Sequence, residues 1–233
     1  MRRLPFAATA LFVLASLVAP ASSEAQQSLN FHVGGFVPRA ERNRDRQDVL
    51  WNNLDFLSFN TRDFNGATAG AEYLVGLGEF LDAGLGVGIY SKSVPSVYSR
   101  LVNANGSEID QDLKLRMVPF TATVRFLPFG RSGAIEPYIG AGVAVINWRY
   151  TEVGEFVDFT DNSIFDDEFT GKGTATGPTI LGGVTFPIGD AWNLGGEIRW
   201  QRALGNLPSD LGFAGDKVDL GGVSYLATFR VRF

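Results

Sequence analysis

The segment LDAGLGVGIY, residues 81–90, decides the fold of this chain of 233 residues. Its odd-numbered residues are all apolar, whereas Asp82 and three glycines occupy the even-numbered positions before Tyr90. A strict alternation of this kind places successive side chains on opposite faces of a β-strand. We therefore expect residues 81–90 to form a strand with one apolar face and one nearly bare face.

The same alternation recurs in seven other segments, which glycine-rich or charged breaks separate. These segments are residues 28–37, 68–75, 113–126, 138–148, 176–186, 192–201 and 223–233. No segment after residue 25 carries the apolar spacing of an amphipathic helix. The sequence therefore predicts a single all-β domain of eight strands.

The apolar phase changes within one of these segments, residues 113–126. Leu113, Leu115 and Met117 are apolar at odd positions, whereas residues 118–126 are apolar at even positions. A shift of one residue turns every following side chain to the other face of a strand. We therefore expect a β-bulge at residues 117–119 that keeps both apolar sets on the outward face.

The connections between the expected strands alternate between short and long. The short ones are residues 76–80, 127–137 and 187–191, and the long, polar ones are residues 38–63, 91–112, 149–173 and 202–219. Three short turns and four long loops fit an eight-stranded antiparallel up-and-down transmembrane β-barrel. Such barrels have short periplasmic turns and long extracellular loops, which would leave both chain ends in the periplasm.

The first 25 residues have the order of a secretory signal peptide: Arg2 and Arg3, an apolar run over residues 6–18, and a small-residue cleavage site ending at Ala25. Cleavage would leave residues 26–233 as the outer-membrane β-barrel domain. Losing Arg2, Arg3 and Glu24 changes the 20 basic and 25 acidic residues to 18 and 24, a net charge of −6. This charge argues against a nucleic-acid partner. The absence of cysteine excludes disulfides and thiolate metal sites.

Two stretches resemble a known family. VPFTATVRFLPFG and EPYIGAGVAV, residues 118–130 and 136–145, resemble the small outer-membrane β-barrel family related to the OmpA transmembrane domain, OmpX and OmpW. The terminal YLATFRVRF, residues 225–233, is similar to the signal that the barrel-assembly machinery recognises. The resemblance implies a cell outer-membrane location, contact with outer-membrane lipids, and an assembly signal formed by Tyr225, Phe229, Val231 and Phe233.

Aromatic residues near the strand ends are also typical of the interfacial girdles of membrane barrels. We expect seven residues in these girdles: Tyr73, Tyr90, Phe126, Tyr138, Trp148, Trp192 and Trp200.

Long charged side chains fall on the face opposite the apolar alternation, so they should point into the barrel. The expected interior polar network consists of Glu72, Asp82, Arg125, Glu197, Arg199, Arg230 and Arg232. Eight strands enclose an interior that side chains fill, and buried charges must be paired. We therefore expect a structural polar plug, with Arg199 and Arg230 as the first candidate partners of Glu197. A charge-selective conduit is the alternative.

The sequence offers little for catalysis or for a cofactor, and we expect neither a catalytic nor a cofactor or metal site. The only histidine, His32, is predicted to be a hydrogen-bonded lumenal side chain rather than a catalytic base. The acidic residues of 152–168 match no defined calcium loop. A second hypothesis is that arginines of the first long loop contact lipopolysaccharide phosphates through charge-assisted hydrogen bonds. These residues are Arg39, Arg42, Arg44, Arg46 and Arg62.

Three functional interpretations remain open from the sequence. The first is a monomeric integral barrel with a structural or surface-interaction role. The second is an OmpW-like barrel that binds or passes a small molecule. The third is a secreted lipocalin-like binding protein, whose interior would be apolar and whose outer face would be polar.

Overall fold

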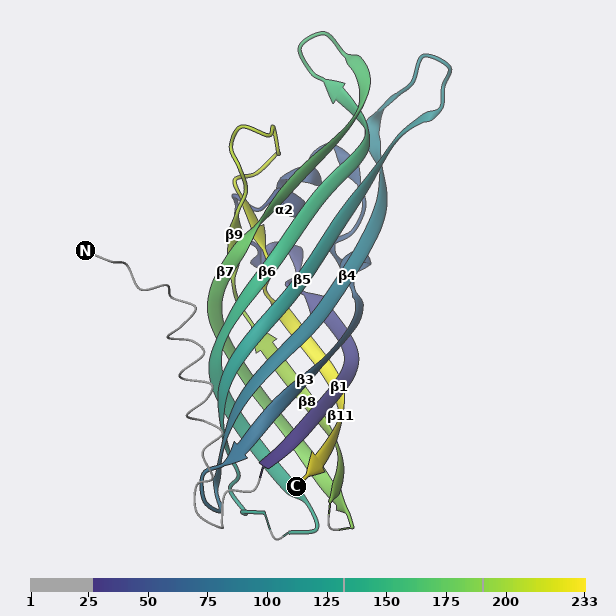
Figure 1. Cartoon of the computed structure of the whole chain (residues 1–233). Coiled ribbons are helices and arrows are strands. Elements are labelled where there is room, and N and C mark those ends of the chain that lie inside the picture. Colours follow the sequence, from purple (N-terminus) through teal and green to yellow (C-terminus); the bar gives the residue numbers. More distant parts are fainter. Residues whose placement is uncertain (1–26, 132, 190) are drawn as a thin grey trace, which may run out of the picture.

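The computed structural model describes residues 27–131, 133–189 and 191–233 (Figure 1). The expected signal peptide, residues 1–25, lies outside the described residues. No helix among the described residues is long and apolar enough to cross a membrane.

Eight long strands form a closed antiparallel barrel, as predicted, and each expected segment contributes to one of them. The strands are β1 (Gln27–Pro38), β3 (Gly66–Gly76), β4 (Leu81–Val102), β5 (Glu108–Phe126), β6 (Glu136–Asp158), β7 (Ser163–Ile188), β8 (Trp192–Gln201) and β11 (Gly222–Arg232). Neighbours in the sequence pair with each other, and β11 closes the ring by pairing with β1 from Ser28↔Arg232 to Pro38↔Gly222. Three short turns lie at one end of the barrel, the turn end, and the longer connections lie at the other, the loop end (Figure 1).

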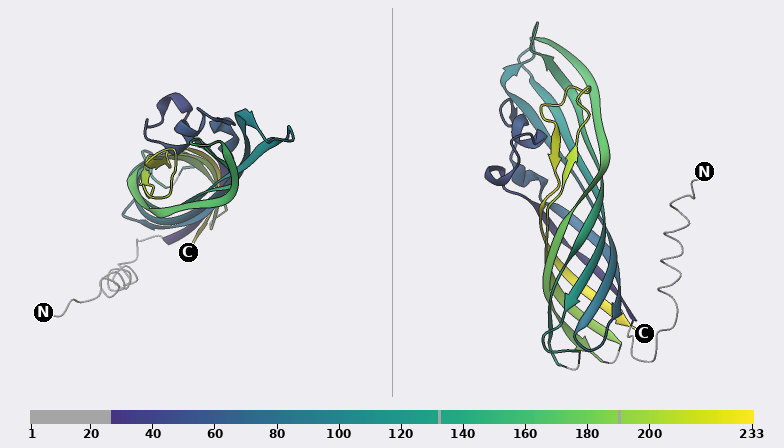
Figure 2. Two further views of the ribbon diagram at one scale, coloured as in Figure 1. Left: turned by 90° about the horizontal axis from the view of Figure 1, so that it is seen from above. Right: turned by 90° about the vertical axis from the view of Figure 1, so that its left-hand side faces the viewer.

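Two of the four expected long loops are mostly strand. Strands β4 and β5 pair beyond the rest of the barrel as far as Val102↔Glu108, and β6 and β7 pair as far as Asp158↔Ser163. These four strands rise above the shorter strands at the loop end (Figures 1 and 2). We call this part the strand extension: residues 91–102, 108–117, 147–158 and 163–174.

The other two long connections fold against the strand extension. The first contains η1 (Glu41–Asn43), α2 (Val49–Asn53), β2 (Leu57–Ser58) and η2 (Thr61–Phe64), and β2 pairs with β4. The last contains the hairpin of β9 (Leu204–Asn206) and β10 (Lys217–Asp219). Seen from the loop end, this hairpin lies within the outline of the barrel and the helical turns of the first connection lie along one side (Figure 2).

The bulge expected at residues 117–119 is absent. Strands β5 and β6 keep one register from Gln111↔Gly154 to Phe126↔Ile139, and the register shift between β4 and β5 lies at Val97/Val102 instead. With no bulge, Leu113, Leu115 and Met117 point inward and are almost completely buried. The prediction that these three residues face outward is therefore wrong.

The change of phase along β5 reflects a change of environment along a regular strand. From Val118 to Phe126 the apolar side chains point outward, and the inward residues Thr121, Thr123 and Arg125 are polar. From Leu113 to Met117 the apolar side chains point inward, and the outward residues Lys114 and Arg116 are charged. The strand thus has an apolar exterior in one half and an apolar interior in the other.

The outward apolar side chains of all eight strands together form a surface that we call the apolar belt. Its large exposed members are Phe31, Val33, Val37, Leu81, Leu85, Val87, Ile89, Phe120, Val124, Phe126, Ile139, Val143, Val145, Ile180, Phe186, Ile188, Trp192, Leu194, Ile198 and Tyr225. An exposed apolar surface that is continuous around a molecule marks contact with a membrane or partner.

Candidate functional site

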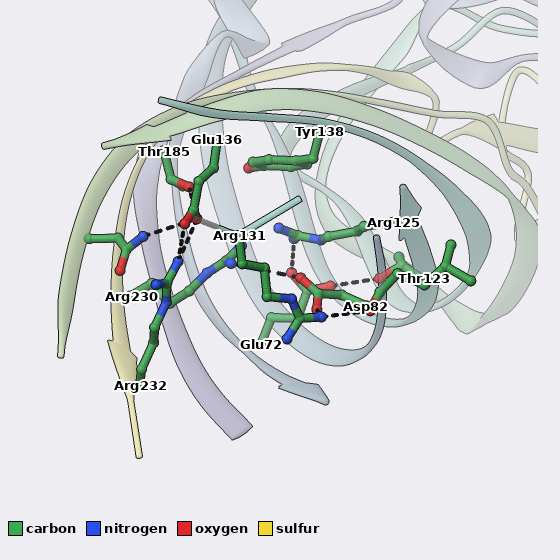
Figure 3. Close-up of polar contacts among 12 residues, drawn as sticks. Glu72, Asp82, Thr123, Arg125, Arg131, Glu136, Tyr138, Thr185, Arg230 and Arg232 are labelled. Atoms are coloured by element: carbon green, nitrogen blue, oxygen red, sulfur yellow. Dashed lines mark hydrogen bonds and ion pairs between the residues drawn. The ribbon is translucent and has the colours of Figure 1, made fainter. Parts of the chain in front are cut away.

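The interior next to the turn end is filled by charged side chains, which we call the polar plug. It consists of Glu72, Asp82, Arg125, Arg131, Glu136, Tyr138, Glu197, Arg199, Arg230 and Arg232. Figure 3 labels all of these residues except Glu197 and Arg199. All seven residues expected in the interior network belong to the plug. The plug contains four carboxylates and five guanidinium groups, so most of its charge is compensated internally.

Arg125 is the central cation of the plug and has no exposed surface. Its guanidinium forms ion pairs with Glu72 and with Glu197, the latter at 3.0 Å between Nη2 and Oε2. Its Cζ lies 4.7 Å from the centre of the Tyr138 ring, a cation–π distance. One buried cation from β5 therefore joins carboxylates from β3 and β8.

The two carboxylates beside Arg125 have further donors. Thr123 Oγ1 donates to Glu72 Oε1 at 2.7 Å, and the Tyr138 hydroxyl donates to Glu197 Oε2 at 2.9 Å. Arg199 Nη2 lies 2.7 Å from Glu197 Oε1 and 3.4 Å from Glu72 Oε2. Of the two partners expected for Glu197, Arg199 is correct. Arg230 is not a partner of Glu197, because its Nη1 lies 3.7 Å from Asp82 Oδ2. Arg125 pairs with Glu197 instead.

A second group of pairs closes the plug at the turn end. Arg131 pairs with Asp82 there (Figure 3). Arg232 Nη2 donates to Glu136 Oε1 at 2.6 Å, and Thr185 and Asn193 each donate to Glu136 Oε2 at 3.3 Å.

Sequence reasoning missed three plug residues, and two of them lay in a segment assigned to a turn. Arg131 and Glu136 fall within residues 127–137, but β6 already begins at Glu136. The third, Tyr138, was expected in an aromatic girdle. The alternation with outward Ile139 places both Glu136 and Tyr138 on the inward face, which is the signal that could have found them.

The structure contradicts the girdle prediction for three of the seven residues. Phe126 and Trp192 are exposed, and Tyr73 and Trp200 lie half-buried on the outward face. Tyr90, Tyr138 and Trp148 are buried inside the barrel instead.

Glycines on the inward face make room for the plug. A Cβ on Gly84 would lie 2.6 Å from Glu72 Oε1, and a Cβ on Gly183 would lie 2.5 Å from the Tyr138 hydroxyl. These distances are far shorter than ordinary contacts, so a larger residue would displace the charged groups. Gly84 on β4 and Gly183 on β7 therefore leave room for the side chains of the plug.

His32 points into the interior just beyond the plug. It lines a cavity of about 30 Å³ together with Thr121, Arg199 and Gln201. Its buried Nδ1 has no hydrogen-bond partner in the part of the chain that the structure describes.

Above this cavity the interior is an apolar core, which we call the loop-end core. Strands β5 and β6 contribute Leu113, Leu115, Ile146, Trp148 and Tyr150, the first connection contributes Val49, Leu50, Leu57 and Phe64, and the last contributes Leu207, Val218 and Leu220. The two connections therefore pack onto the inner face of the strand extension as the core of a water-soluble domain would.

An ion-pair network joins the two connections to each other. Arg44 Nε lies 2.5 Å from Asp48 Oδ2, and Arg44 Nη2 donates to the Asp219 carbonyl at 3.0 Å. Arg39 Nη1 pairs with Asp219 Oδ2 at 2.8 Å. Asp48 also caps α2 by accepting from Trp51 N. Two of the five arginines expected to contact lipopolysaccharide are thus engaged within the protein.

Glu152 on β6 is a buried carboxylate that contacts the first connection. Asn53 Nδ2 donates to its Oε1 at 2.7 Å and the Tyr150 hydroxyl at 2.8 Å, and burial raises the pKa of Glu152 above its ordinary value. These contacts join α2 to β6. No group of three or more histidine, cysteine, aspartate or glutamate residues suited to a metal ion occurs in the described ranges.

This raised pKa predicts how pH affects the packing of the first connection. A carboxyl whose pKa is higher in the folded than in the unfolded state binds its proton more tightly when folded, so it favours folding at low pH. That contribution is lost as the pH rises from the ordinary pKa through the raised one. Glu152→Gln should therefore slow amide hydrogen exchange over residues 49–64 at pH 7, relative to the wild type, and should have less effect at pH 4.

Glu168→Gln is the control for this prediction, because Glu168 is exposed on the outward face. It should leave exchange over residues 49–64 unchanged at both pH values. Faster exchange in Glu152→Gln than in the wild type at pH 7 would contradict the prediction.

No protein-family model matches the chain, and no curated protein matches it in sequence. Solved structures do resemble it. A major outer membrane protein from Thermus thermophilus is 12% identical, with a TM-score of 0.52, covering 90% of this chain and 99% of that one. Outer membrane protein W of E. coli is 14% identical, with a TM-score of 0.43, covering 91% and 100%. The N-terminal β-barrel domain of Pseudomonas aeruginosa OprF is 11% identical, with a TM-score of 0.41, covering 90% and 100%.

The fold is therefore that of the small outer-membrane β-barrels, as the sequence resemblance implied. The first of these structures carries this assignment, and at 12% identity the likeness concerns the fold alone.

Proposed function

We propose that the protein is a monomeric, integral barrel of the cell outer membrane, with a closed interior and a structural or surface-interaction role. The observation that carries this proposal is the reversal of polarity along single strands. From Val118 to Phe126, the half of β5 toward the turn end, apolar side chains face outward and polar ones face inward, and in the half that belongs to the strand extension the arrangement is the opposite. Lipid around the half toward the turn end and water around the strand extension account for both arrangements.

The reversal also weighs against a secreted lipocalin-like barrel. Such a protein needs an apolar interior and a polar exterior along its whole length. Here only the strand extension has that arrangement, and the apolar belt covers the remaining exterior. In the proposed orientation the turn end faces the periplasm and the strand extension, with its folded connections, faces the outside.

The interior supports a closed barrel rather than a conduit. The plug residues pair with one another across the barrel, and the loop-end core fills the space above them. The cavity between the two holds about 30 Å³, which is room for about one water molecule. Neither a catalytic role nor a cofactor is part of this proposal.

Single-channel recording in planar bilayers tests the closed state. The purified barrel, shown to be inserted by its resistance to protease, should give no current steps above those of the lipid alone. Steady current steps would contradict the closed barrel and would favour the OmpW-like passage.

The terminal strand supports a role for the barrel-assembly machinery during biogenesis. Tyr225, Phe229, Val231 and Phe233 alternate along the outward side at the end of the chain, and Phe233 is 69% exposed. Within the described residues, the hydrogen bond of Phe233 is the one that its backbone N–H donates to Gln27 O, and its side chain forms none. A side chain with so little packing is free to serve recognition.

We predict that Phe233→Ala lowers the yield of folded barrel in the outer membrane several-fold, while the purified variant refolds into detergent as the wild type does. The yield is measured by fractionation and the folding by resistance to protease. Leu77→Ala is the control, since Leu77 is an exposed apolar residue of a turn and should change neither. An unchanged yield for Phe233→Ala would contradict the assembly role.

A further inference from the structure

A row of basic side chains crosses the outward face of three adjacent strands at the base of the strand extension. Arg116 on β5 is the direct cross-strand partner of Arg149 on β6, and Arg149 is the partner of Lys172 on β7. All three side chains are exposed, as is Lys114, the next outward residue of β5. We call these four residues the cationic strip.

This arrangement is unfavourable for the protein alone. Like charges directly opposite each other on neighbouring strands repel. Among residues 27–131, 133–189 and 191–233, no carboxylate lies within ion-pair distance of Arg116, Arg149 or Lys172, and Lys114 has only an exposed contact of 3.8 Å with Asp112. An anion at the strip would remove this repulsion.

The strip lies directly beyond the apolar belt. Arg116 is the next outward residue after Val118, the last apolar outward residue of β5, and Arg149 is the second after Val145 on β6. In a membrane-embedded barrel this is the level of the lipid headgroups, where the outer leaflet presents phosphate to the protein. Long basic side chains at this boundary reach headgroups while their stems cover apolar surface.

A shallow groove gives the strip a shape suited to a headgroup. It has a volume of about 210 Å³ and is lined by three residues of the strip, Lys114, Arg116 and Arg149, together with Ser91, Leu115, Thr151 and Glu168. Two guanidinium groups can each bind phosphate oxygens through paired N–H donors, and the hydroxyl groups of Ser91 and Thr151 can donate to neighbouring oxygens. Glu168 is the single carboxylate of this lining. It lies on β7, on the side of the groove away from the apolar belt.

We infer that the cationic strip binds the phosphate of an anionic lipid headgroup in the outer leaflet. This inference rests on the proposed insertion of the barrel in the outer membrane. It places the headgroup contact on β5, β6 and β7 instead of the first connection, where Arg39 and Arg44 are already paired with Asp219 and Asp48.

The test compares two variants that each lose three positive charges. The strip variant carries Arg116→Gln, Arg149→Gln and Lys172→Gln. The control carries Arg42→Gln, Arg46→Gln and Arg62→Gln, three exposed arginines of the first connection. Each protein is inserted into vesicles of phosphatidylcholine alone or of phosphatidylcholine with fluorescent lipid A, and energy transfer from tryptophan measures lipid A binding. Inorganic phosphate added to phosphatidylcholine vesicles is a further arm, read by the thermal unfolding midpoint.

Basic residues at a membrane surface contribute enough that losing three should weaken lipid A binding on the order of 100-fold in the strip variant. The control should bind lipid A as the wild type does, and high salt should reduce the difference between the two. Equal binding by wild type and strip variant, or a loss in the control alone, would overturn the inference while leaving the barrel assignment intact. If inorganic phosphate raised the thermal unfolding midpoint of the wild type but not that of the strip variant, free phosphate would be sufficient as the anion. That result would overturn the lipid as its source. Failure of the wild type to insert into either vesicle would overturn both the inference and the proposed function.

Discussion

Arg125→Met is expected to lower the free energy of unfolding of the barrel by about 3 to 5 kcal/mol, the cost of leaving buried charges without their partner. Arg125 has no exposed surface and pairs with both Glu72 and Glu197, which Arg199 also contacts. Methionine fills a similar length without the charge. Unfolding by urea in lipid vesicles measures the change.

A compensated variant separates charge from packing in this experiment. Adding Glu72→Gln to Arg125→Met removes one of the two carboxylates that lose this cation and leaves Glu197 paired with Arg199, so part of the lost stability should return. Stability equal to that of the wild type in Arg125→Met alone would show that water screens the plug, and would contradict the paired interior described above.

The second large loss of stability is expected from a substitution on the outward face of β8. Ile198 is 54% exposed in the apolar belt, next to the inward Glu197. Ile198→Arg should cost about 2 to 4 kcal/mol in a bilayer if the side chain lies near the midplane. The same urea unfolding in vesicles measures it.

Ser163→Arg is the matched control, because Ser163 is exposed in the strand extension and its cross-strand partner is Asp158, so an arginine there faces no like charge. Arginine there should change stability by less than about 0.5 kcal/mol, as at an ordinary surface. Equal effects of the two substitutions would mean that the apolar belt and the strand extension share one environment.

The period of two in the sequence was sufficient to predict the barrel. It placed the seven charged residues of the network in the interior, because a strand that pairs without interruption keeps every second side chain on one face. It could not predict how these charges pair. Arg125 and Glu197 are 72 positions apart, and their contact across the interior depends on barrel closure, because β6 and β7 separate β5 from β8 in the sheet.

The strand extension was missed for a related reason. The sequence interpretation held that apolar residues on a strand always face lipid, so Leu113, Leu115 and Met117 required a bulge. Alternation shows that two faces differ but not which face points inward. On β5 the charged outward residues Lys114 and Arg116 were the available sign that water surrounds this part of the strand.

The absence of cysteine permits a direct measurement of the change from lipid to water along β5. Single cysteines at outward positions 114, 116, 120, 122 and 124, each carrying a nitroxide label, report collisions with oxygen, which concentrates in lipid, and with a water-soluble nickel chelate. In barrels inserted into vesicles, labels at 120, 122 and 124 should collide mainly with oxygen, and labels at 114 and 116 mainly with the chelate. Chelate-dominated collisions at 120, 122 and 124 would contradict a lipid-facing apolar belt and with it the membrane barrel.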